Sequence, residues 1–404
     1  MNSKRKNKIS ECCDILDNLR VPINDEIRQT MQGNIPYYGA NGIQGYIDKY
    51  IFDEDLILLA EDGGNFEEYH TRPIAYKISG KSWVNNHAHI LRAKPEFNQD
   101  FIFYSLVHKD ITKYLNSGTR SKLNKSELEN IEIDFPATKD EEDKIAKILS
   151  TADAVIEKTQ AAIAKYKAIK QGMLQDLFTR GIDLNTNKLR PRYQDAPELY
   201  KESKLGMIPR EWEDKELGDV GEVRMCRRVF NYETSDQGDI PFYKIRTFGK
   251  QPDAYISKEL YDSYRQQFSF PNKGDILISA AGTIGRTIIY DGTPSYFQDS
   301  NIVWIENNGH LITNEYLYQV FQIVEYKTEG GTIQRLYNSI LKSALFPCPP
   351  KPEQQLITER LNAIDNKLQT EQTYLQKMQS LKKGLMEDLL SGRKQVKINE
   401  AATV

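Results

Sequence analysis

Residues 140–177 read DEEDKIAKILSTADAVIEKTQAAIAKYKAIKQGMLQDL, and apolar side chains recur in this stretch at a spacing of seven. One row begins with Ile145, Ala152 and Thr159, and two further rows run beside it. Three adjacent rows at this spacing form one apolar stripe along a helix, whose other face carries mostly lysine, glutamate and glutamine. The stretch therefore predicts a long helix with one face to bury.

A second stretch, residues 352–390, has the same heptad pattern. Gly172 in the first stretch corresponds to Gly384 in the second, a shift of 212 residues, and the same shift places Asp153 on Asp365. Repeated matches at one shift, in one heptad phase, indicate an internal duplication. Two unrelated amphipathic helices are the alternative interpretation.

The segments before each helix also repeat. IPYY at 35–38 recurs as IPFY at 240–243, and DLILLA at 55–60 recurs as DILISA at 275–280. Both segments are rich in short runs typical of strands. In the first segment the expected strands lie within 51–60, 73–78, 82–91 and 131–135.

The sequence thus predicts an α+β protein in which two mixed α/β domains are separated by two long helices. Each helix has about 40 residues and is roughly 60 Å long, and neither can bury its stripe alone. We expect an antiparallel coiled coil, because a pseudo-two-fold repeat then packs in a closed and equivalent way; parallel pairing is the alternative. The predicted parts are a first domain (1–138), a helix (139–180), a connector (181–204), a second domain (205–350), a helix (351–392) and a tail (393–404).

Composition narrows the class of protein. The chain has 404 residues, 39% of them hydrophobic and 27% charged, with a net charge of −3. Its length predicts at least two domains. We expect no membrane span, because no apolar run is long enough, and no secretory signal, because the N-terminus lacks an apolar core.

The cysteines and histidines do not suggest a metal site. Four cysteines occur without a CxxC spacing, which favours a reducing cytoplasm over disulfides or structural zinc. His87 and His89 are expected on one face of a strand, but no third ligand is suggested, so no metal is predicted. The cysteines are Cys12, Cys13, Cys226 and Cys348.

Several motifs together resemble one protein family. YYGANGIQGY at 37–46, followed by LLAEDGG at 58–64, resembles the first target-recognition domain of type I restriction–modification specificity subunits. IPREWE at 208–213 with LGDV at 217–220 resembles the usual opening of the second domain, and the long helices resemble that family's two central repeats. The resemblance covers nearly the whole chain. The first domain lacks a Trp-Glu opening, so its first strand is expected to be shorter.

The resemblance implies a non-catalytic subunit that specifies a DNA sequence. Each recognition domain would read one half of a bipartite site in double-stranded DNA, and the helices would set the unread gap. Two modification subunits would dock on the helices to form an adenine methyltransferase, and restriction subunits would add ATP-driven translocation and cleavage. S-adenosylmethionine, ATP and Mg²⁺ would belong to those partners, and no cofactor is expected on this chain.

No catalytic constellation is evident in the sequence. CPPK at 348–351 lacks the amide and the aromatic residue of the amino-methyltransferase motif, and AGTIG at 281–285 lacks the lysine of a phosphate loop. The acidic residues 140–143 suit the first turn of a helix. Two alternatives stay open: a self-sufficient DNA adenine methyltransferase, and a coiled-coil adaptor that binds only proteins.

Candidate DNA contacts follow from the chemistry of readout. Base edges are read by arginine, lysine, amides and hydroxyls, and phosphates are bound by cations and hydroxyls. In the first domain the candidates are Tyr37, Tyr38, Asn41, Gln44, Arg120, Lys122 and Lys125. In the second they are Arg224, Arg227, Arg228, Tyr243, Lys244, Arg246, Lys250, Arg286, Thr332, Gln334 and Arg335. The alternatives are that the tyrosines pack in the core and that the arginine pair 227–228 is a solvated patch.

Overall fold

The computed structural model describes residues 4–116, 121–326 and 335–398, and the chain divides into two compact units. Unit 1 consists of residues 1–162 and 372–404, and unit 2 of residues 163–371. Two long helices, α5 (Lys139–Thr179) and α10 (Lys351–Leu390), each contribute to both units. Each unit therefore combines one mixed α/β domain with one part of each helix, and the predicted fold class is confirmed.

Unit 1 contains a strand pair and two four-stranded sheets. The pair is β1 (Arg5–Lys8) with β10 (Glu132–Phe135); the first sheet has the order β2 (Cys13–Ile15), β9 (Ala88–Ala93), β6 (Leu56–Ala60), β7 (Ala75–Ile78). The second has the order β4 (Gly42–Ile47), β3 (Gln32–Gly39), β8 (Lys81–Val84), β5 (Phe52–Asp53). The helices are α1 (Ile9–Cys12), α2 (Asp25–Thr30), α3 (Gln99–Leu106) and α4 (Lys125–Leu128).

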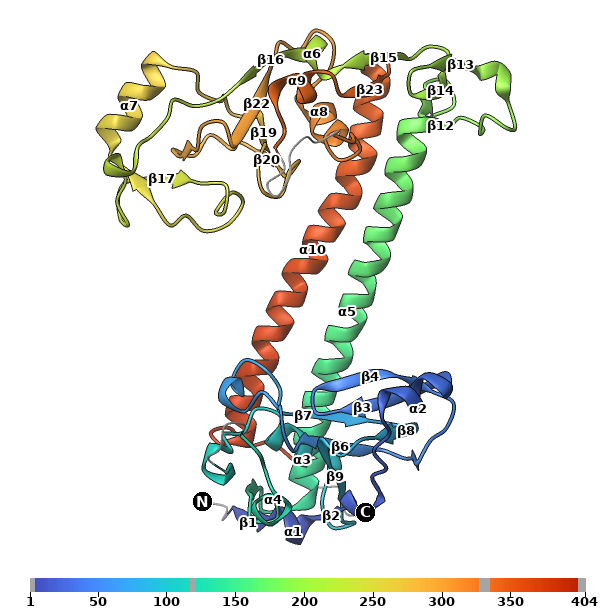
Figure 1. Ribbon diagram of the computed structural model, residues 1–404, viewed down its shortest axis with the longest axis vertical. Helices are drawn as coiled ribbons and strands as arrows, with labels where there is room; N and C mark the ends of the chain where they lie inside the picture. Colours follow the sequence, from blue (N-terminus) through green and yellow to red (C-terminus); the bar gives the residue numbers. More distant parts are fainter. Residues whose placement is uncertain (1–3, 117–120, 327–334, 399–404) are drawn as a thin grey trace. The chain divides into compact units, whose positions relative to one another are not determined.

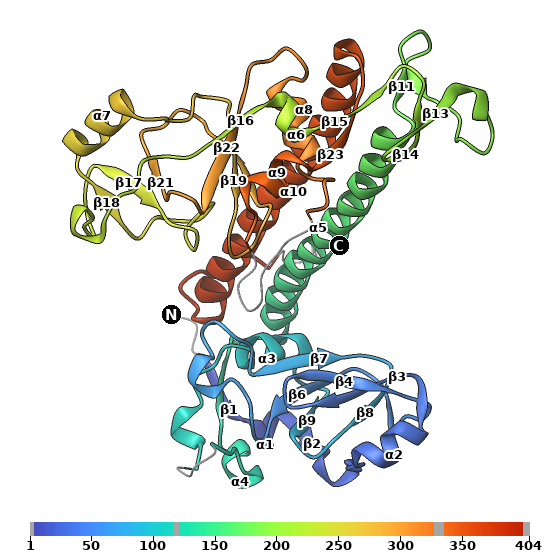
Figure 2. The same cartoon turned by 45° about the horizontal axis from the view of Figure 1, so that its top comes forward.

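Strand β6 is buried on both faces, which explains its unbroken apolar sequence. Ile57 and Leu59 pack in one hydrophobic core with α3, whereas Leu56 and Leu58 pack in a second core with Val84 of β8. Successive side chains of a strand point to opposite faces, so only a strand covered on both sides is apolar throughout. Figure 2 shows α3 on one side of β6 and β9, with β3 and β8 on the other.

Unit 2 repeats this plan. A strand pair, β15 (Glu213–Glu216) with β23 (Leu345–Cys348), accompanies a sheet of order β16 (Gly221–Arg224), β22 (Ile302–Asn307), β19 (Ile276–Ser279), β20 (Thr287–Ile289). A three-stranded sheet has the order β18 (Tyr255–Ile256), β17 (Ile240–Tyr243), β21 (Tyr296–Phe297). The helices are α6 (Leu217–Val220), α7 (Lys258–Gln267), α8 (Asn314–Val320) and α9 (Asn338–Lys342). In Figure 1, α8 and α9 lie on one side of β19 and β22, and α7 with β17 lies on the other.

The connector between the domains forms two short hairpins in unit 2. They pair β11 (Ile182–Asp183) with β12 (Lys188–Leu189), and β13 (Tyr200–Ser203) with β14 (Gly206–Pro209). The second hairpin extends past residue 204, so regular strand pairing continues from the connector into the predicted second domain.

The duplication extends to the pairing of individual residues. Tyr37 of β3 pairs in parallel with Trp83 of β8, and Phe242 of β17 pairs in parallel with Tyr296 of β21. The repeated IPYY and IPFY motifs therefore occupy the same place in two copies of one fold. Strands that run parallel also end at the same edge, so the loops that follow them come together.

Within each unit the two long helices are antiparallel. In unit 1, Leu149 near the start of α5 shares a core with Leu389 at the end of α10. In unit 2, Leu177 at the end of α5 shares a core with Leu361 near the start of α10. The predicted antiparallel pairing is therefore confirmed.

Two ion pairs between the helices are also equivalent under the 212-residue shift. Lys170 of α5 binds Asp365 of α10 at 2.5 Å, and Asp153 of α5 binds Lys382 of α10. Each lysine corresponds to the other under the shift, and so does each aspartate. The pseudo-two-fold repeat is thus preserved in polar contacts as well as in the apolar stripe.

Two expectations from the sequence are wrong in detail. The segment 82–91 is not one strand, because β8 ends at Val84 and β9 begins at Ala88 in a different sheet. His87 therefore lies in the break between them and shares no strand face with His89. The first strand is also not shorter, since β1 and β15 each have four residues, fixed by their ladders to β10 and β23.

All four cysteines are free and buried. Among the residues that the structure describes, each helix is either too short or too polar to cross a bilayer.

Candidate nucleic-acid interface

In unit 1 the loops at the ends of β3, β6 and β8 enclose a cavity of about 330 Å³. Asn41 and Gln44, both predicted site residues, lie in its wall with His87. Asn41 donates to the carbonyl of Gly63 at 2.8 Å, and Asn85 donates to Oε1 of Gln44 at 3.0 Å. The turn between β3 and β4 is therefore fixed to its neighbouring loops by amide side chains.

Lys122 reaches the same region from the segment before α4. It forms an isolated bridge with Asp62, which also lines the cavity, and its ammonium group lies 3.0 Å from Glu61. His87 contacts Asp62 at 2.8 Å. The structure thus brings together three of the residues predicted in this domain: Asn41, Gln44 and Lys122.

Behind this cavity lies a largely buried group of polar side chains: Asp17, Arg20, Glu61 and His89. His89 is 1% exposed; its Nδ1 lies 2.6 Å from Asp17, and its Nε2 lies 2.8 Å from the carbonyl of Leu123. Both ring nitrogens therefore have hydrogen-bond partners, which fix the ring from two sides. Glu61 binds Arg20 at 2.5 Å. The group ties the segment around Leu123 to the sheet.

Asp17, Glu61 and His89 also have the spacing of a metal site. Arg20, however, lies 3.5 Å from Asp17, and cations already bind both carboxylates. Burial alone would raise the pKa of Asp17, but its hydrogen bond to His89 and the charges around it lower that pKa below the usual 3.8. We therefore interpret this group as an ion network that positions a loop.

Replacing Asp17 with asparagine is expected to destabilise the chain by about 3 kcal/mol at pH 7, because it removes the largely buried carboxylate that binds His89 and leaves Arg20 with Glu61 alone. The lowered pKa means that the aspartate stabilises the fold above its unfolded-state pKa and loses this effect as the pH falls through the folded-state value. The variant should consequently lose less stability below pH 4 than the unmodified chain.

Urea unfolding at pH 7 and between pH 5 and 3 measures both effects. Asp48→Asn, at an exposed position in the same unit, is the matched control. An Asp17→Asn chain as stable as this control at pH 7 would contradict the ion network.

The remaining predicted residues of unit 1 that the structure describes do not line this cavity. Tyr37 is 2% exposed, and Arg28 lies over its ring, 5.2 Å from the centroid. It packs in the interior, as the alternative interpretation held. Tyr38 is half-buried against Tyr76, Lys125 is exposed at the start of α4, and Arg120 lies outside the described residues.

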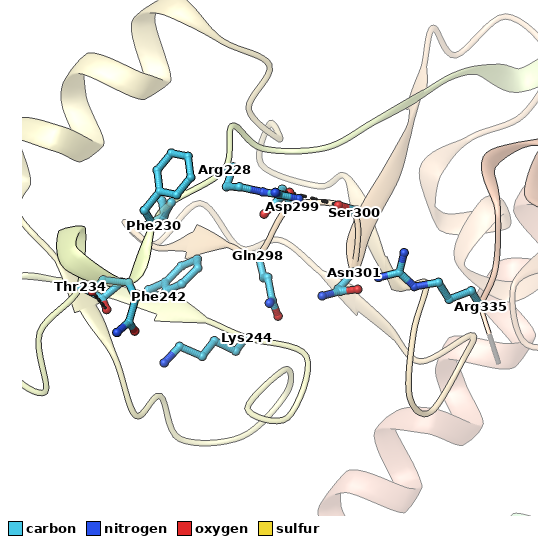
Figure 3. A pocket seen from close by; sticks show the side chains of 12 residues that line it. Arg228, Phe230, Thr234, Phe242, Lys244, Gln298, Asp299, Ser300, Asn301 and Arg335 are labelled. Carbon is cyan, nitrogen blue, oxygen red and sulfur yellow. Dashed lines mark hydrogen bonds and ion pairs between the residues drawn. The ribbon is translucent and has the colours of Figure 1, made fainter. Parts of the chain in front are cut away.

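In unit 2 the ends of β17 and β21, together with residues from 228–234 and Arg335, line a cavity of about 280 Å³ (Figure 3). Arg228, Lys244 and Arg335, all predicted, line it together with Gln298 and Asn301. Arg228 binds Asp299 at 2.9 Å. The wall carries three cations and one carboxylate, so the cavity is predominantly positive.

Two exposed aromatic side chains extend this surface. Phe230 lines the cavity and stacks on Tyr232 with 5.6 Å between ring centroids. The two side chains are 45% and 83% exposed. Aromatic rings beside a positive cavity are typical of surfaces that bind nucleic acids.

The other predicted residues of unit 2 that the structure describes lie outside this cavity. Arg224 binds Glu306 at 2.8 Å, Arg227 lies over Phe268, and Arg246 binds Asp253. Tyr243 stacks on Phe297, Lys250 is exposed, Arg286 donates to the carbonyl of Phe248 at 2.8 Å, and Thr332 and Gln334 lie outside the described residues.

The sequence did not identify the residues that follow the second parallel strand. Asn85 donates its backbone N–H to Tyr38, and Gln298 donates its own to Tyr243, each at 3.0 Å. Asn85 and Gln298 are therefore equivalent. In both domains a short polar run directly follows the second parallel strand, and this run could have identified these residues from the sequence. The runs are NNH at 85–87, after Val84, and QDSN at 298–301, after Phe297.

Comparison with known proteins gives a consistent result. Residues 3–166 and 209–380 match the family described as type I restriction modification DNA specificity domain. The chain is 42% identical over 359 residues to a putative type I restriction enzyme specificity subunit from Haemophilus influenzae, covering 88% of this chain and 86% of that protein. It is 25% identical to the type I restriction enzyme MjaVIII specificity subunit from Methanocaldococcus jannaschii, covering 92% and 88%. The fold resembles the crystal structure of a type I restriction-modification S subunit from M. genitalium, with a TM-score of 0.63, 15% identity, and coverage of 98% and 97%.

Proposed function

Because the chain belongs to the type I restriction modification DNA specificity family, we propose that it selects the DNA sequence on which a type I restriction–modification complex acts. Each domain reads one half of a bipartite site in double-stranded DNA. The observation that carries this proposal is that the two domains share one strand plan but differ in the side chains of their cavities. Two copies of one strand plan each place a cavity at the end of a parallel strand pair, β3 with β8 and β17 with β21, and those cavities carry different side chains.

The helices serve as spacer and docking surface in this proposal. Helices α5 and α10 are each continuous over about 40 residues, and each takes part in both units. A paired helix that belongs to both readers can set the number of unread base pairs between the half-sites. We also propose that two modification subunits dock on it.

The chemistry belongs to the partners. Methylation by the modification subunits uses S-adenosylmethionine, and cleavage by restriction subunits uses ATP and Mg²⁺. The chain itself supplies recognition and no catalysis. Its compartment is the cytoplasm, where DNA and these partners meet.

The test is reconstitution. The purified chain, mixed with its modification subunits, is expected to direct adenine methylation to one bipartite sequence, read by mapping methylated adenines. The chain alone is expected to methylate nothing. Methylation by the isolated chain would favour a self-sufficient methyltransferase, and the absence of any salt-sensitive DNA binding with partners present would favour a protein-only adaptor.

Inserting one heptad into each long helix is expected to lengthen the unread gap. Seven residues add about 10 Å to a helix, which equals about three base pairs of DNA at 3.4 Å per step. Both half-sites should keep their sequences, because the readers are unchanged. Mapping methylated adenines in the reconstituted complex measures the gap; an unchanged gap would argue against the helices as spacer.

A further inference from the structure

Two kinds of polar group line the cavity of unit 2: long cationic side chains and a neutral amide that is held in place. Lys244 and Arg335 are long cationic side chains with no ion-pair partner among the described residues, and Arg228 is 61% exposed although it binds Asp299. Such cations suit phosphates, which bind point charges without strict geometry. Gln298, in contrast, is neutral and held in place by the backbone.

The orientation of the Gln298 amide is fixed by its neighbours. Its Oε1 accepts a hydrogen bond from the backbone N–H of Ile245 at 2.9 Å. A backbone N–H can only donate, so the atom facing it must be the oxygen. The amide nitrogen is consequently left for the cavity, and no described residue accepts from it.

The acceptors around this nitrogen are already used or buried. The carboxylate of Asp299 accepts from Arg228 at 2.9 Å and from Ser300 at 3.1 Å. Oδ1 of Asn301 is buried, and no described residue donates to it. The cavity therefore presents mainly donors. Figure 3 shows Gln298 between Lys244 and Asn301 in its wall.

We propose that Gln298 reads the major-groove edge of a guanine in the second half-site, while Arg228, Lys244 and Arg335 bind neighbouring phosphates. This inference rests on the proposed function. Guanine presents two adjacent acceptors, N7 and O6, to the major groove, whereas adenine places a donor beside its N7. A donor-rich cavity selects the edge that has only acceptors.

Unit 1 has no free amide donor at the equivalent position. Its equivalent residue, Asn85, uses both ends of its amide inside the protein, donating to Gln44 at 3.0 Å and accepting from the backbone N–H of His87 at 2.8 Å. The same position is thus structural in one domain and available for readout in the other. This difference lets one fold recognise two different half-sites.

The test uses the chain assembled with its modification subunits and DNA duplexes that differ at single positions. In the unmodified complex, one guanine of the second half-site is expected to be required, with roughly 10- to 100-fold weaker binding when it is replaced by adenine. In Gln298→Glu, one carboxylate oxygen still accepts from the backbone N–H of Ile245. The other oxygen takes the place of the amide nitrogen, so a hydrogen-bond donor in the cavity becomes an acceptor. Its preference at that position should move to cytosine, whose amino group donates.

Gln266→Glu is the matched control, because it adds the same charge at an exposed position on α7 outside the cavity. Gln298→Asn provides a second, uncharged variant; its shortened amide should lose the guanine preference without gaining one for cytosine. Circular-dichroism melting confirms that each variant folds.

Three results would overturn the proposal: a second half-site without guanine, a Gln298→Glu effect spread equally over all positions, or a Gln298→Asn complex that keeps its guanine preference. If the unmodified complex methylates no bipartite site at all, the proposed function fails instead.

Discussion

Replacing Glu353 with alanine is expected to destabilise unit 2 by about 3–5 kcal/mol, the usual cost of removing one partner from a buried ion pair. The Glu353 side chain is fully buried at the start of α10. Its carboxylate accepts from Arg190 at 2.5 and 3.0 Å, from the indole of Trp212 at 2.9 Å, and from the backbone N–H of Ile182 at 2.6 Å. Alanine would remove the acceptor of all three, and it would leave the donors of Trp212 and Ile182 buried.

Arg190 has a second, weaker partner that limits the loss. Glu211 lies 3.7 Å from it, but this carboxylate is 61% exposed and therefore well screened by water. The donors from Trp212 and Ile182 have no such substitute among the described residues. The larger part of the effect should consequently come from the unsatisfied neutral donors and the cavity left behind.

Urea denaturation of the full chain, followed by tryptophan fluorescence, measures this change because Trp212 itself contacts the carboxylate. Glu359→Ala is the control, since that residue is exposed on the same helix. We expect the control to change stability by less than about 0.5 kcal/mol. Equal stability of the two variants would show that the buried network does not hold the connector to α10.

Replacing Arg228, Lys244 and Arg335 together with glutamine is expected to weaken DNA binding by the assembled complex roughly 100-fold at low salt. Each cation that binds a phosphate releases about 0.9 counterion, so the slope of log affinity against log salt should fall by about 2.7. The sequence preference should stay unchanged, because phosphates carry no sequence information. Binding measured at several salt concentrations gives both values.

The matched control replaces three lysines of the connector, Lys188, Lys201 and Lys204, with glutamine. It changes the net charge of unit 2 by the same amount, at positions outside the cavity. If both triple variants change the salt slope equally, the effect is one of overall charge, and the cavity is not a DNA contact.

The sequence was most informative where a pattern is local and periodic. The heptad rows around Ile145 and Leu361 predicted two long helices, and the shift of 212 residues predicted their equivalence. The apolar run at 56–60 predicted a strand, and burial of that strand on both faces explains why apolar and polar residues do not alternate in it. These features depend on neighbours within a few residues, so the sequence displays them directly.

The cavities were less predictable because they join distant segments. Asn41, Gln44 and Lys122 were expected from their loops, yet Asn85 was hidden inside a segment that seemed to be one continuous strand. In unit 2, Lys244 and Arg335 were expected, but Gln298 was not. The pairing of β3 with β8 and of β17 with β21 creates these sites, and parallel pairing leaves no pattern in either strand alone.

The sequence by itself determined that this protein is a duplicated pair of mixed domains joined by two amphipathic helices, because apolar spacing fixes which faces must be buried. Only the tertiary structure decided that Tyr37 is a core residue and that Gln298 faces a cavity, because exposure depends on what packs above a side chain. It also decided that Glu353, one of many glutamates in a helix, is the buried partner of Arg190. A local pattern can show that a charge is present, whereas its partner comes from chain segments that only folding brings into contact.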